Sequence, residues 1–284
     1  MNRYGRGGAC LNNWRRAGWL LCLMAFTASA GASEALRDLP YGDAHAQRLD
    51  VYRPERAHDA PIIVMVHGGA WMFGDKANAA VVQPKAAHWE STGYVFVSVD
   101  NRLWPDADPL EQAKDVATAL AYVQHHAREW GGDPSRVVLM GHSAGAHLVA
   151  LLDASPRLAE QQGARPWLGT VSLDAGAIDV PALMGAPHAN FYDRVFGRDP
   201  GYWRSASPFD QLSRDAPPLL LVCSSRRMAS CPHNHAFAER AKDLGVQATV
   251  IEVPLSHGEI NATLGAPGDY TGRVDAFLHG LGLP

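Results

Sequence analysis

Short apolar runs alternate with helix-like segments along most of the chain. The runs Ile62–Val66, Tyr94–Val99 and Val137–Met140 are almost continuously apolar, which is typical of strands buried on both faces of a parallel sheet. Residues 109–130 instead carry apolar side chains at helical spacing and form the clearest predicted helix. The remaining predicted strands are 48–53, 168–173, 218–222 and 248–253, and the remaining predicted helices are 77–92, 147–152, 235–244 and 270–281. This order predicts an α/β fold, with a mostly parallel central sheet and helices on both faces.

One segment, residues 179–210, breaks this alternation. It has no regular strand or helix pattern, and it is rich in aromatic side chains such as Phe191, Tyr192 and Trp203. We interpret it as an insertion that lies over the carboxyl ends of the predicted strands, where sites of α/β proteins form. Its aromatic side chains would then shape a substrate pocket or simply pack as part of the core.

The stretch Gly141-His-Ser-Ala-Gly145 joins the predicted strand 137–140 to the predicted helix 147–152. A strand that meets a helix through Gly-x-Ser-x-Gly must turn in little space. The two glycines tolerate a close backbone approach, and the serine is left in a strained position at the tip. Its Oγ then points away from the sheet, while its backbone lies at the positive end of the helix. The pattern predicts that Ser143 is a nucleophile.

A serine hydroxyl is a weak nucleophile, so it needs a base and a pocket for the oxyanion that forms during attack on a carbonyl. The chain has 13 histidines. His257 is the candidate base because it follows the last predicted strand. The backbone N–H groups of Gly69, Ala70 and Ala144 are the predicted oxyanion donors. His67, which precedes the glycines, is predicted to be structural.

These candidate groups share one position relative to the predicted strands. Each of them follows a strand of the predicted parallel sheet: the segment 67–70, Ser143, Asp174 and His257. The carboxyl ends of parallel strands lie at one edge, where sites of α/β proteins form. We therefore expect the four to meet in a single site.

Five motifs together resemble a known family. They are His67–Trp71, Asn101–Pro105, Trp130–Pro134, Gly141–Gly145 and His257–Ile260, and they are similar to those of α/β-hydrolases of the hormone-sensitive-lipase and kynurenine-formamidase type. The resemblance covers most of the chain after residue 30. It implies the α/β-hydrolase fold, with nucleophile, acid and histidine in that order along the chain. It also implies an esterase or amidase that works through an acyl-enzyme and needs no cofactor.

The acid of the triad departs from the family pattern. The family usually carries an Asp in the loop after the strand that here ends at Val222, but residues 223–234 contain no carboxylate. A triad still needs a group that orients the imidazole and stabilises its charged form. Asp174, at the end of the preceding strand, is the predicted acid. Asp179 is the alternative, although it matches a family position that is not normally catalytic.

The N-terminal 30 residues are predicted to be a secretory signal peptide. Basic residues precede the apolar run Ala17–Phe26, and Ala28-Ser29-Ala30 forms a small-residue cleavage site. An uncleaved anchor is the alternative, but the run is short for a membrane span. We expect one hydrolase domain over residues 31–284, secreted or periplasmic, with no membrane span after cleavage.

Cleavage would also change the charge and the cysteine content. The net charge would move from −4 to −8 because four arginines and no acids are removed, which argues against nucleic acid or an anionic membrane as partner. Only Cys223 and Cys231 would remain, and an exported chain with two cysteines usually pairs them. The alternative is a metal site built with His233 and His235. The spacing is not a common zinc pattern, so we predict a disulfide and no metal.

The sequence therefore predicts an enzyme that cleaves small carboxylic esters, with formamides and other simple amides as further small-molecule candidates. Ser143, His257 and Asp174 would form its triad. The alternative is a binding protein that keeps the fold and has lost turnover, because the usual loop carboxylate is missing.

Overall fold

The computed structural model describes residues 35–284, and the predicted signal peptide, residues 1–30, lies outside the described residues. Within the described part, one sheet has the strand order β1-β2-β4-β3-β5-β6-β7-β8. The strands are β1 (Leu36–Pro40), β2 (Arg48–Tyr52), β3 (Ala60–Val66), β4 (Val95–Val99), β5 (Gly132–His142), β6 (Gly169–Leu173), β7 (Leu219–Ser224) and β8 (Ala248–Val253). Every predicted strand is present. The edge strand β1 was not predicted, because its half-exposed side chains leave no apolar pattern.

The sheet is parallel from β4 through β3 to β8, and β1 and β2 extend it in antiparallel pairing at the β4 edge. All seven residues of β3 are buried, which is why this strand reads as an unbroken apolar run. The carboxyl ends of β3, β5, β6, β7 and β8 therefore share one edge. Residues that directly follow these strands are brought to that edge by the topology alone.

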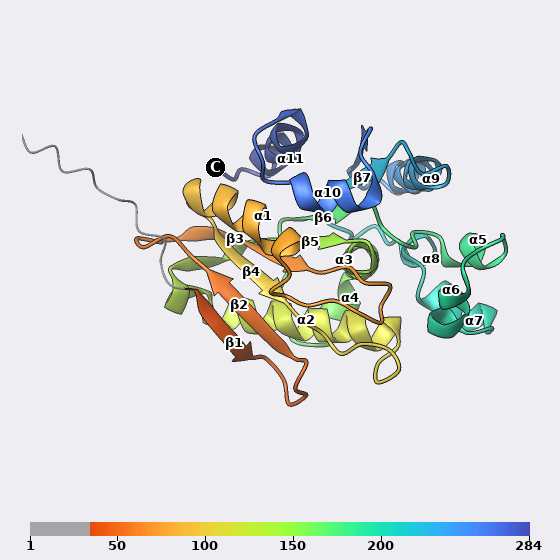
Figure 1. The fold of residues 1–284 in the computed structure, drawn as a ribbon, viewed down its shortest axis with the longest axis horizontal. Coiled ribbons are helices and arrows are strands. Elements are labelled where there is room, and N and C mark those ends of the chain that lie inside the picture. Colours follow the sequence, from red (N-terminus) through yellow and green to blue (C-terminus); the bar gives the residue numbers. More distant parts are fainter. Residues whose placement is uncertain (1–34) are drawn as a thin grey trace, which may run out of the picture. The chain divides into compact units, whose positions relative to one another are not determined.

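Helices cover both faces of the sheet (Figure 1). The main ones are α1 (Ala79–Ser91), α2 (Pro109–His126), α3 (Ala144–Ala154), α9 (Ser230–Asp243), α10 (His257–Thr263) and α11 (Asp269–Gly280). On one face, Trp89 of α1 packs in the same apolar cluster as Val274 of α11. On the other, α2 and α3 share a cluster, and Phe237 of α9 packs with Ala146 of α3. No helix in residues 35–284 combines the length and apolar character needed to cross a membrane.

Helix α3 is the central helix of its face. All of its residues are buried, because it lies between the sheet and helices α2 and α8. A helix with no exposed side needs no polar stripe. The same burial fixes the position of its first turn, which begins directly after Ser143.

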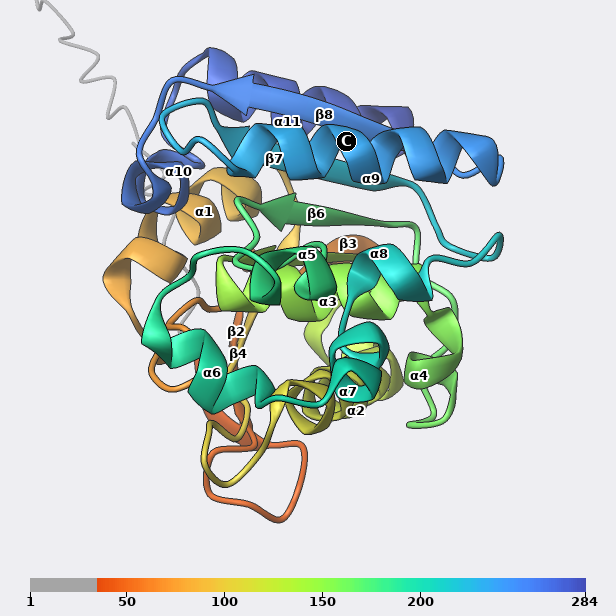
Figure 2. The ribbon, with the colours of Figure 1, turned by 90° about the vertical axis from the view of Figure 1, so that its right-hand side faces the viewer.

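Three local predictions need correction. The segment 179–210 is not irregular but forms four short helices, α5 (Val180–Met184), α6 (Asn190–Phe196), α7 (Pro200–Ser205) and α8 (Pro208–Gln211) (Figure 2). Three of them, α5, α7 and α8, begin with Pro at the first or second position and a polar N-cap residue, both of which favour the start of a helix. All four helices are too short to show periodicity in the sequence. Helix α9 begins at Ser230 rather than His235. The last four residues of the long predicted helix form a separate 3-10 turn, Ala127–Trp130.

Helix α1 shows how the fold accommodates a proline. Pro84 lies inside the helix and lacks the N–H that would bond the Ala80 carbonyl. The Nζ of Lys85 takes that place, donating to the Ala80 oxygen at 2.9 Å, and it also donates to the carbonyl of Asn261 in α10. Lys85 is fully buried, and no carboxylate bonds its Nζ within the described residues. Burial lowers the pKa of Lys85 to about 7, so the amine is largely neutral above that pH and its two N–H groups match its two acceptors.

We predict that Lys85 makes stability depend on pH. Because the folded pKa is about 7 and that of an unfolded lysine is near 10.4, the unfolded state binds more protons between these values. The free energy of unfolding should therefore rise by about 2 kcal/mol from pH 7 to pH 9 relative to Lys85→Met. Urea denaturation of both proteins at the two pH values measures this difference. Parallel pH dependence of the two proteins would contradict it.

Candidate active site

The corner at Ser143 is built from close backbone contacts. Ser143 has a φ of 56°, in the left-handed region that strains any residue except glycine. A Cβ on Gly141 would lie 2.4 Å from the carbonyl oxygen of Gly145, and a Cβ on Gly145 would lie 2.4 Å from that of Val66. Only glycine fits at either position. The Ser143 N–H donates to Leu173 at 3.0 Å, which ties the corner to the end of β6.

His257 reaches the corner from the first turn of α10, a helix that the sequence analysis did not include. Ser256 and Glu259 form a capping box that starts the helix there. The Nε2 of His257 lies 2.8 Å from Ser143 Oγ, and its Nδ1 lies 2.6 Å from Asp174 Oδ2. The carboxylate can only accept, so Nδ1 carries the proton and Nε2 is free to accept from the serine.

Asp174 is buried under this histidine with a φ of 51°. It receives hydrogen bonds from the Ser224 N–H and from the Ser230 hydroxyl as well as from His257. Burial by itself would raise the pKa of Asp174. The hydrogen bonds from His257 and Ser230, with the nearby charge of Arg227, outweigh it and hold that pKa far below its ordinary value. The carboxylate is therefore ionised at any ordinary working pH.

The alternative acid, Asp179, serves another purpose. Its side chain accepts from the Ala182 N–H at 2.9 Å and caps α5. Among the described residues it makes no hydrogen bond to a histidine. The structure therefore brings Asp174, and not Asp179, to His257.

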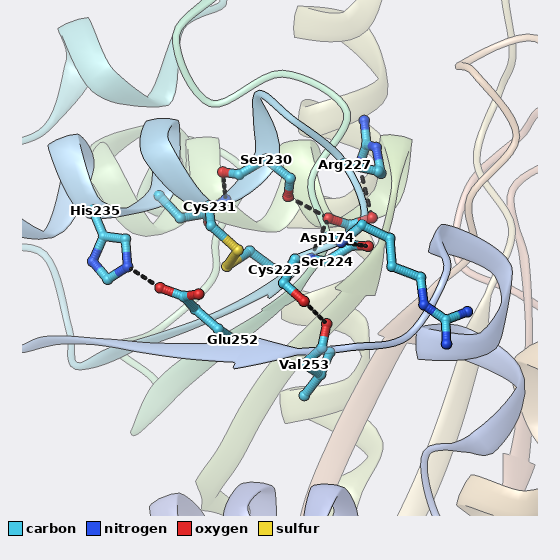
Figure 3. The surroundings of a disulfide bond; sticks show 12 residues. Asp174, Cys223, Ser224, Arg227, Ser230, Cys231, His235, Glu252 and Val253 are labelled. Atoms are coloured by element: carbon cyan, nitrogen blue, oxygen red, sulfur yellow. Dashed lines mark hydrogen bonds and ion pairs between the residues drawn. A yellow bond between two sulfur atoms is a disulfide. The ribbon is translucent and has the colours of Figure 1, made fainter.

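The loop after β7 contributes two residues that sequence analysis missed. Arg227 Nη1 lies 2.7 Å from Asp174 Oδ2, and Ser230 donates to Oδ1 of the same carboxylate. Figure 3 shows both side chains converging on Asp174. This loop is the one without a carboxylate, and it supplies donors in its place. The absence of an acid from 223–234 was visible in the sequence, but nothing in it indicated which of two adjacent arginines would turn inward.

The predicted disulfide is present and closes this loop. Cys223 at the end of β7 and Cys231 in α9 are bonded to each other. Both cysteines are thereby unavailable as metal ligands, and His235 pairs with Glu252 at 2.7 Å. The alternative metal site of Cys223, Cys231, His233 and His235 is therefore not formed.

Two of the predicted oxyanion donors, Gly69 and Ala70, line the same cavity as Ser143, and the third, Ala144, directly follows it in the chain. Gly68 is so close to the corner that a Cβ on it would lie 2.9 Å from Ser143 Cβ. The N–H groups of Gly69, Ala70 and Ala144 have no hydrogen-bond acceptor within residues 35–284. Gly69 has a φ of 133°, which a residue with a side chain would not adopt readily. Three unpaired N–H groups near a serine can bind a negatively charged oxygen.

Trp71 holds the segment 67–70, which contains two of the predicted oxyanion donors, in its conformation. Its φ of 59° is unusual for a bulky residue. The buried indole donates from Nε1 to Nδ1 of His147 at 3.1 Å, and the Trp71 carbonyl accepts from Gln112 at 2.9 Å. Burial lowers the pKa of His147 to about 4, so this ring is neutral and able to accept. Helix α3 thus supports both the nucleophile corner and the loop that faces it.

His142, which sequence analysis did not assign to the site, lies against His257. The two ring centroids are 4.6 Å apart, and His142 Nε2 donates to the His257 carbonyl at 2.9 Å. Burial, with a smaller effect from His257, lowers the pKa of His142 to about 3. A neutral ring therefore fixes the first residue of α10 without placing a second charge beside the catalytic candidate.

A cavity of about 870 Å³ opens at Ser143. Phe73, Phe191 and Tyr192 line it together with Ser143 and His257. Phe191 and Tyr192 belong to α6, so part of the 179–210 segment borders the site. Tyr192 donates to the Gly176 carbonyl at 3.0 Å, which fixes α6 next to the nucleophile.

Comparisons with known proteins agree with this fold. The BD-FAE family model matches residues 49–166. Esterase LipC of Mycobacterium tuberculosis is 32% identical over 242 residues, which are 78% of this chain and 59% of LipC. A carbohydrate esterase from gut microbiota superposes with a TM-score of 0.74 at 20% identity, covering 89% of this chain and 98% of that one. Esterase B of Lactobacillus rhamnosis gives 0.70 at 21% identity, covering 88% and 85%.

The chain has the α/β-hydrolase fold. Its sheet order and the helices on both faces are those of this fold. The chain spans about three-fifths of the length of LipC, so the activity of that longer protein does not transfer to it directly.

Within this fold, the chain places a hydroxyl, an imidazole and a carboxylate in one hydrogen-bonded row. Such a row can move a proton from Ser143 to His257 while Asp174 compensates the charge that forms on the ring. The arrangement is suited to nucleophilic attack on a carbonyl or phosphoryl centre.

We predict that the two aspartates differ sharply in their effect on Ser143. Asp174→Asn should slow labelling of Ser143 by a fluorophosphonate by up to about 10⁴-fold, because an amide in place of the carboxylate favours the wrong imidazole tautomer. Asp179→Asn should leave the labelling rate within a few-fold, because it alters only a helix cap. The rate of covalent labelling, followed by intact mass, measures both. Equal rates in the two variants would remove Asp174 from the site.

Proposed function

We propose that this protein is a serine hydrolase that cleaves small carboxylic esters through an acyl-enzyme. One observation carries the proposal: Ser143 Oγ lies 2.8 Å from His257 Nε2, and His257 Nδ1 lies 2.6 Å from a buried, ionised Asp174. A row of this kind activates a serine. The N–H groups of Gly69 and Ala70 line the same cavity and have no acceptor within residues 35–284, which supports the same proposal.

In the proposed reaction, Ser143 Oγ attacks the ester carbonyl while His257 Nε2 takes its proton. The N–H groups of Gly69, Ala70 and Ala144 stabilise the oxyanion of the tetrahedral intermediate. His257 then returns the proton to the leaving alcohol, and the acyl group remains on Ser143. A water molecule, activated by the same imidazole, releases the acid and restores the enzyme. Asp174 stabilises the imidazolium in both halves of the cycle.

Esters are the proposed substrate class because the matched relative is named an esterase. Formamides and other simple amides would pass through the same tetrahedral intermediate, but no contact in the site favours an amide leaving group. The cavity of about 870 Å³ is of the size that holds small molecules.

The alternative function, a binding protein without turnover, rested on the missing loop carboxylate. Asp174 bonds His257 from the end of β6 instead, so that reason no longer applies. The donors that the loop supplies to Asp174 also favour a carboxylate kept ionised for catalysis over an apolar binding pocket.

We predict that hydrolysis depends on Ser143. The wild-type protein should hydrolyse p-nitrophenyl butyrate, and Ser143→Ala should lower kcat by at least about 10⁴-fold, because the nucleophile is lost while the fold is kept. Release of p-nitrophenol at pH 8 measures the rate, and circular dichroism checks the fold of the variant. Background-level rates in both proteins would support the binding function instead.

We also propose that the chain is exported and that residues 1–30 are removed. The basic and apolar pattern of this segment supports export, as does the Cys223–Cys231 disulfide, since disulfides persist in oxidising compartments.

The expected product of export is a chain that begins at Gly31. Expression of all 284 residues in a bacterium with an intact secretion pathway should give this form outside the cytoplasm. Intact mass measures the cleavage position and shows whether the two cysteines are oxidised. A full-length product that stays in the cytoplasm would contradict export.

A further inference from the structure

The cavity at Ser143 has an uneven charge. Among its lining residues in the described part of the chain, Arg227 is the only lysine or arginine, and none is an aspartate or glutamate. The walls are otherwise apolar or neutral, with Trp71, Phe73 and Phe191 among them. Phe73 is 68% exposed, so the apolar surface continues to the mouth. Arg227 is paired with the buried Asp174 on one side, and no carboxylate of the cavity lining faces the rest of its guanidinium.

Arg227 has donors left to bind an anion. Its Nη1 contacts Asp174 at 2.7 Å and lies 3.3 Å from His257 Nδ1. Its Nε and Nη2 have no hydrogen-bond partner among residues 35–284, and the side chain remains 36% exposed. A guanidinium presents its N–H groups in a planar fork that matches a carboxylate with two parallel hydrogen bonds.

Asp174 has enough hydrogen-bond donors without this arginine. It already accepts from Ser224, Ser230 and His257. A cation at Asp174 also offsets part of the negative charge that should stabilise the imidazolium during the reaction. An anion bound to Arg227 would reduce that competition, so it would favour the transition state as well as binding.

From this geometry we propose that the substrate of the proposed esterase is an ester that carries a free carboxylate, which Arg227 binds. The inference rests on the proposed function. The guanidinium lies across the imidazole from Ser143, so several bonds must separate the carboxylate from the reacting carbonyl. The apolar walls bind the part of the molecule between the two groups.

Two matched substrate pairs test this proposal, one for each side of the ester. The acyl pair is the mono-4-nitrophenyl ester of adipic acid and the 4-nitrophenyl ester of adipic acid monoamide. The alcohol pair is 4-carboxyphenyl butyrate and 4-carbamoylphenyl butyrate. Within each pair only the charge changes appreciably. The ratio of kcat/KM for the charged and the neutral member therefore cancels any general loss of activity in a variant.

The wild-type protein should prefer the charged member of at least one pair by about tenfold, as expected for a charge-assisted hydrogen bond at a partly exposed site. Arg227→Gln should abolish this preference, and Arg227→Lys should retain part of it. The preference should also fall as sodium chloride is raised, because salt screens the charges. Arg226→Gln is the matched control, because Arg226 pairs with Glu259 and is absent from the cavity lining; its ratio should equal that of the wild type.

Two outcomes would overturn the proposal. One is equal or better hydrolysis of the neutral member in both pairs by the wild-type protein. The other is a preference for the charged member that survives in Arg227→Gln.

Failure to hydrolyse any of the four esters would count against the proposed function instead. The inference would then be decided by calorimetry with Ser143→Ala and two non-chromogenic ligands, monomethyl adipate and methyl adipamate. Tighter binding of the carboxylate that disappears in Ser143→Ala/Arg227→Gln supports the role of Arg227. Equal binding of the two ligands to Ser143→Ala overturns it.

Discussion

The sharp corner at Ser143 is the constraint on which the rest of the site depends. Its backbone is strained, with a φ of 56°, and such strain persists only where the surroundings leave no alternative. Here residues 137–142 of the strand before it and the whole helix after it are buried, and its N–H and carbonyl bond Leu173 and Gly176. The glycines on either side have no room for a side chain. The packing of the surrounding core thus holds Ser143 in its position.

The buried charge of Asp174 is the second organising element. An ionised carboxylate inside a protein is stable only when it is paired and hydrogen-bonded. Satisfying it draws in Ser224 at the end of β7, Ser230 in α9 and His257 in α10. These residues lie 50, 56 and 83 positions after Asp174 in the sequence. One charge therefore aligns the imidazole and anchors the disulfide-closed loop that brings Arg227 to the cavity.

The loop after β7 combines two roles in this chain. It would be the expected position for the acid, yet it contributes a cation and a hydroxyl to an acid that comes from β6. This exchange leaves the proton-transfer row complete and adds a positive charge to an otherwise neutral cavity. In the function and substrate that we propose, catalysis and substrate selection would be coupled through the same carboxylate.

The sequence by itself determined the α/β class and the central strands, and it indicated Ser143, His257 and the segment 67–70 as parts of one site. Apolar runs and glycine spacing are local signals, so they can be recognised without the tertiary structure. The sequence also indicated Asp174 as the acid, but left Asp179 open until a contact could be seen. The short helices of 179–210, the start of α9 and the edge strand β1 carry too little periodicity to be recognised. Only the tertiary structure decided that His142 turns toward His257 and that Arg227 rather than Arg226 turns toward Asp174. Which way a side chain points in a loop depends on the charges and packing it meets there, and these come from distant parts of the chain.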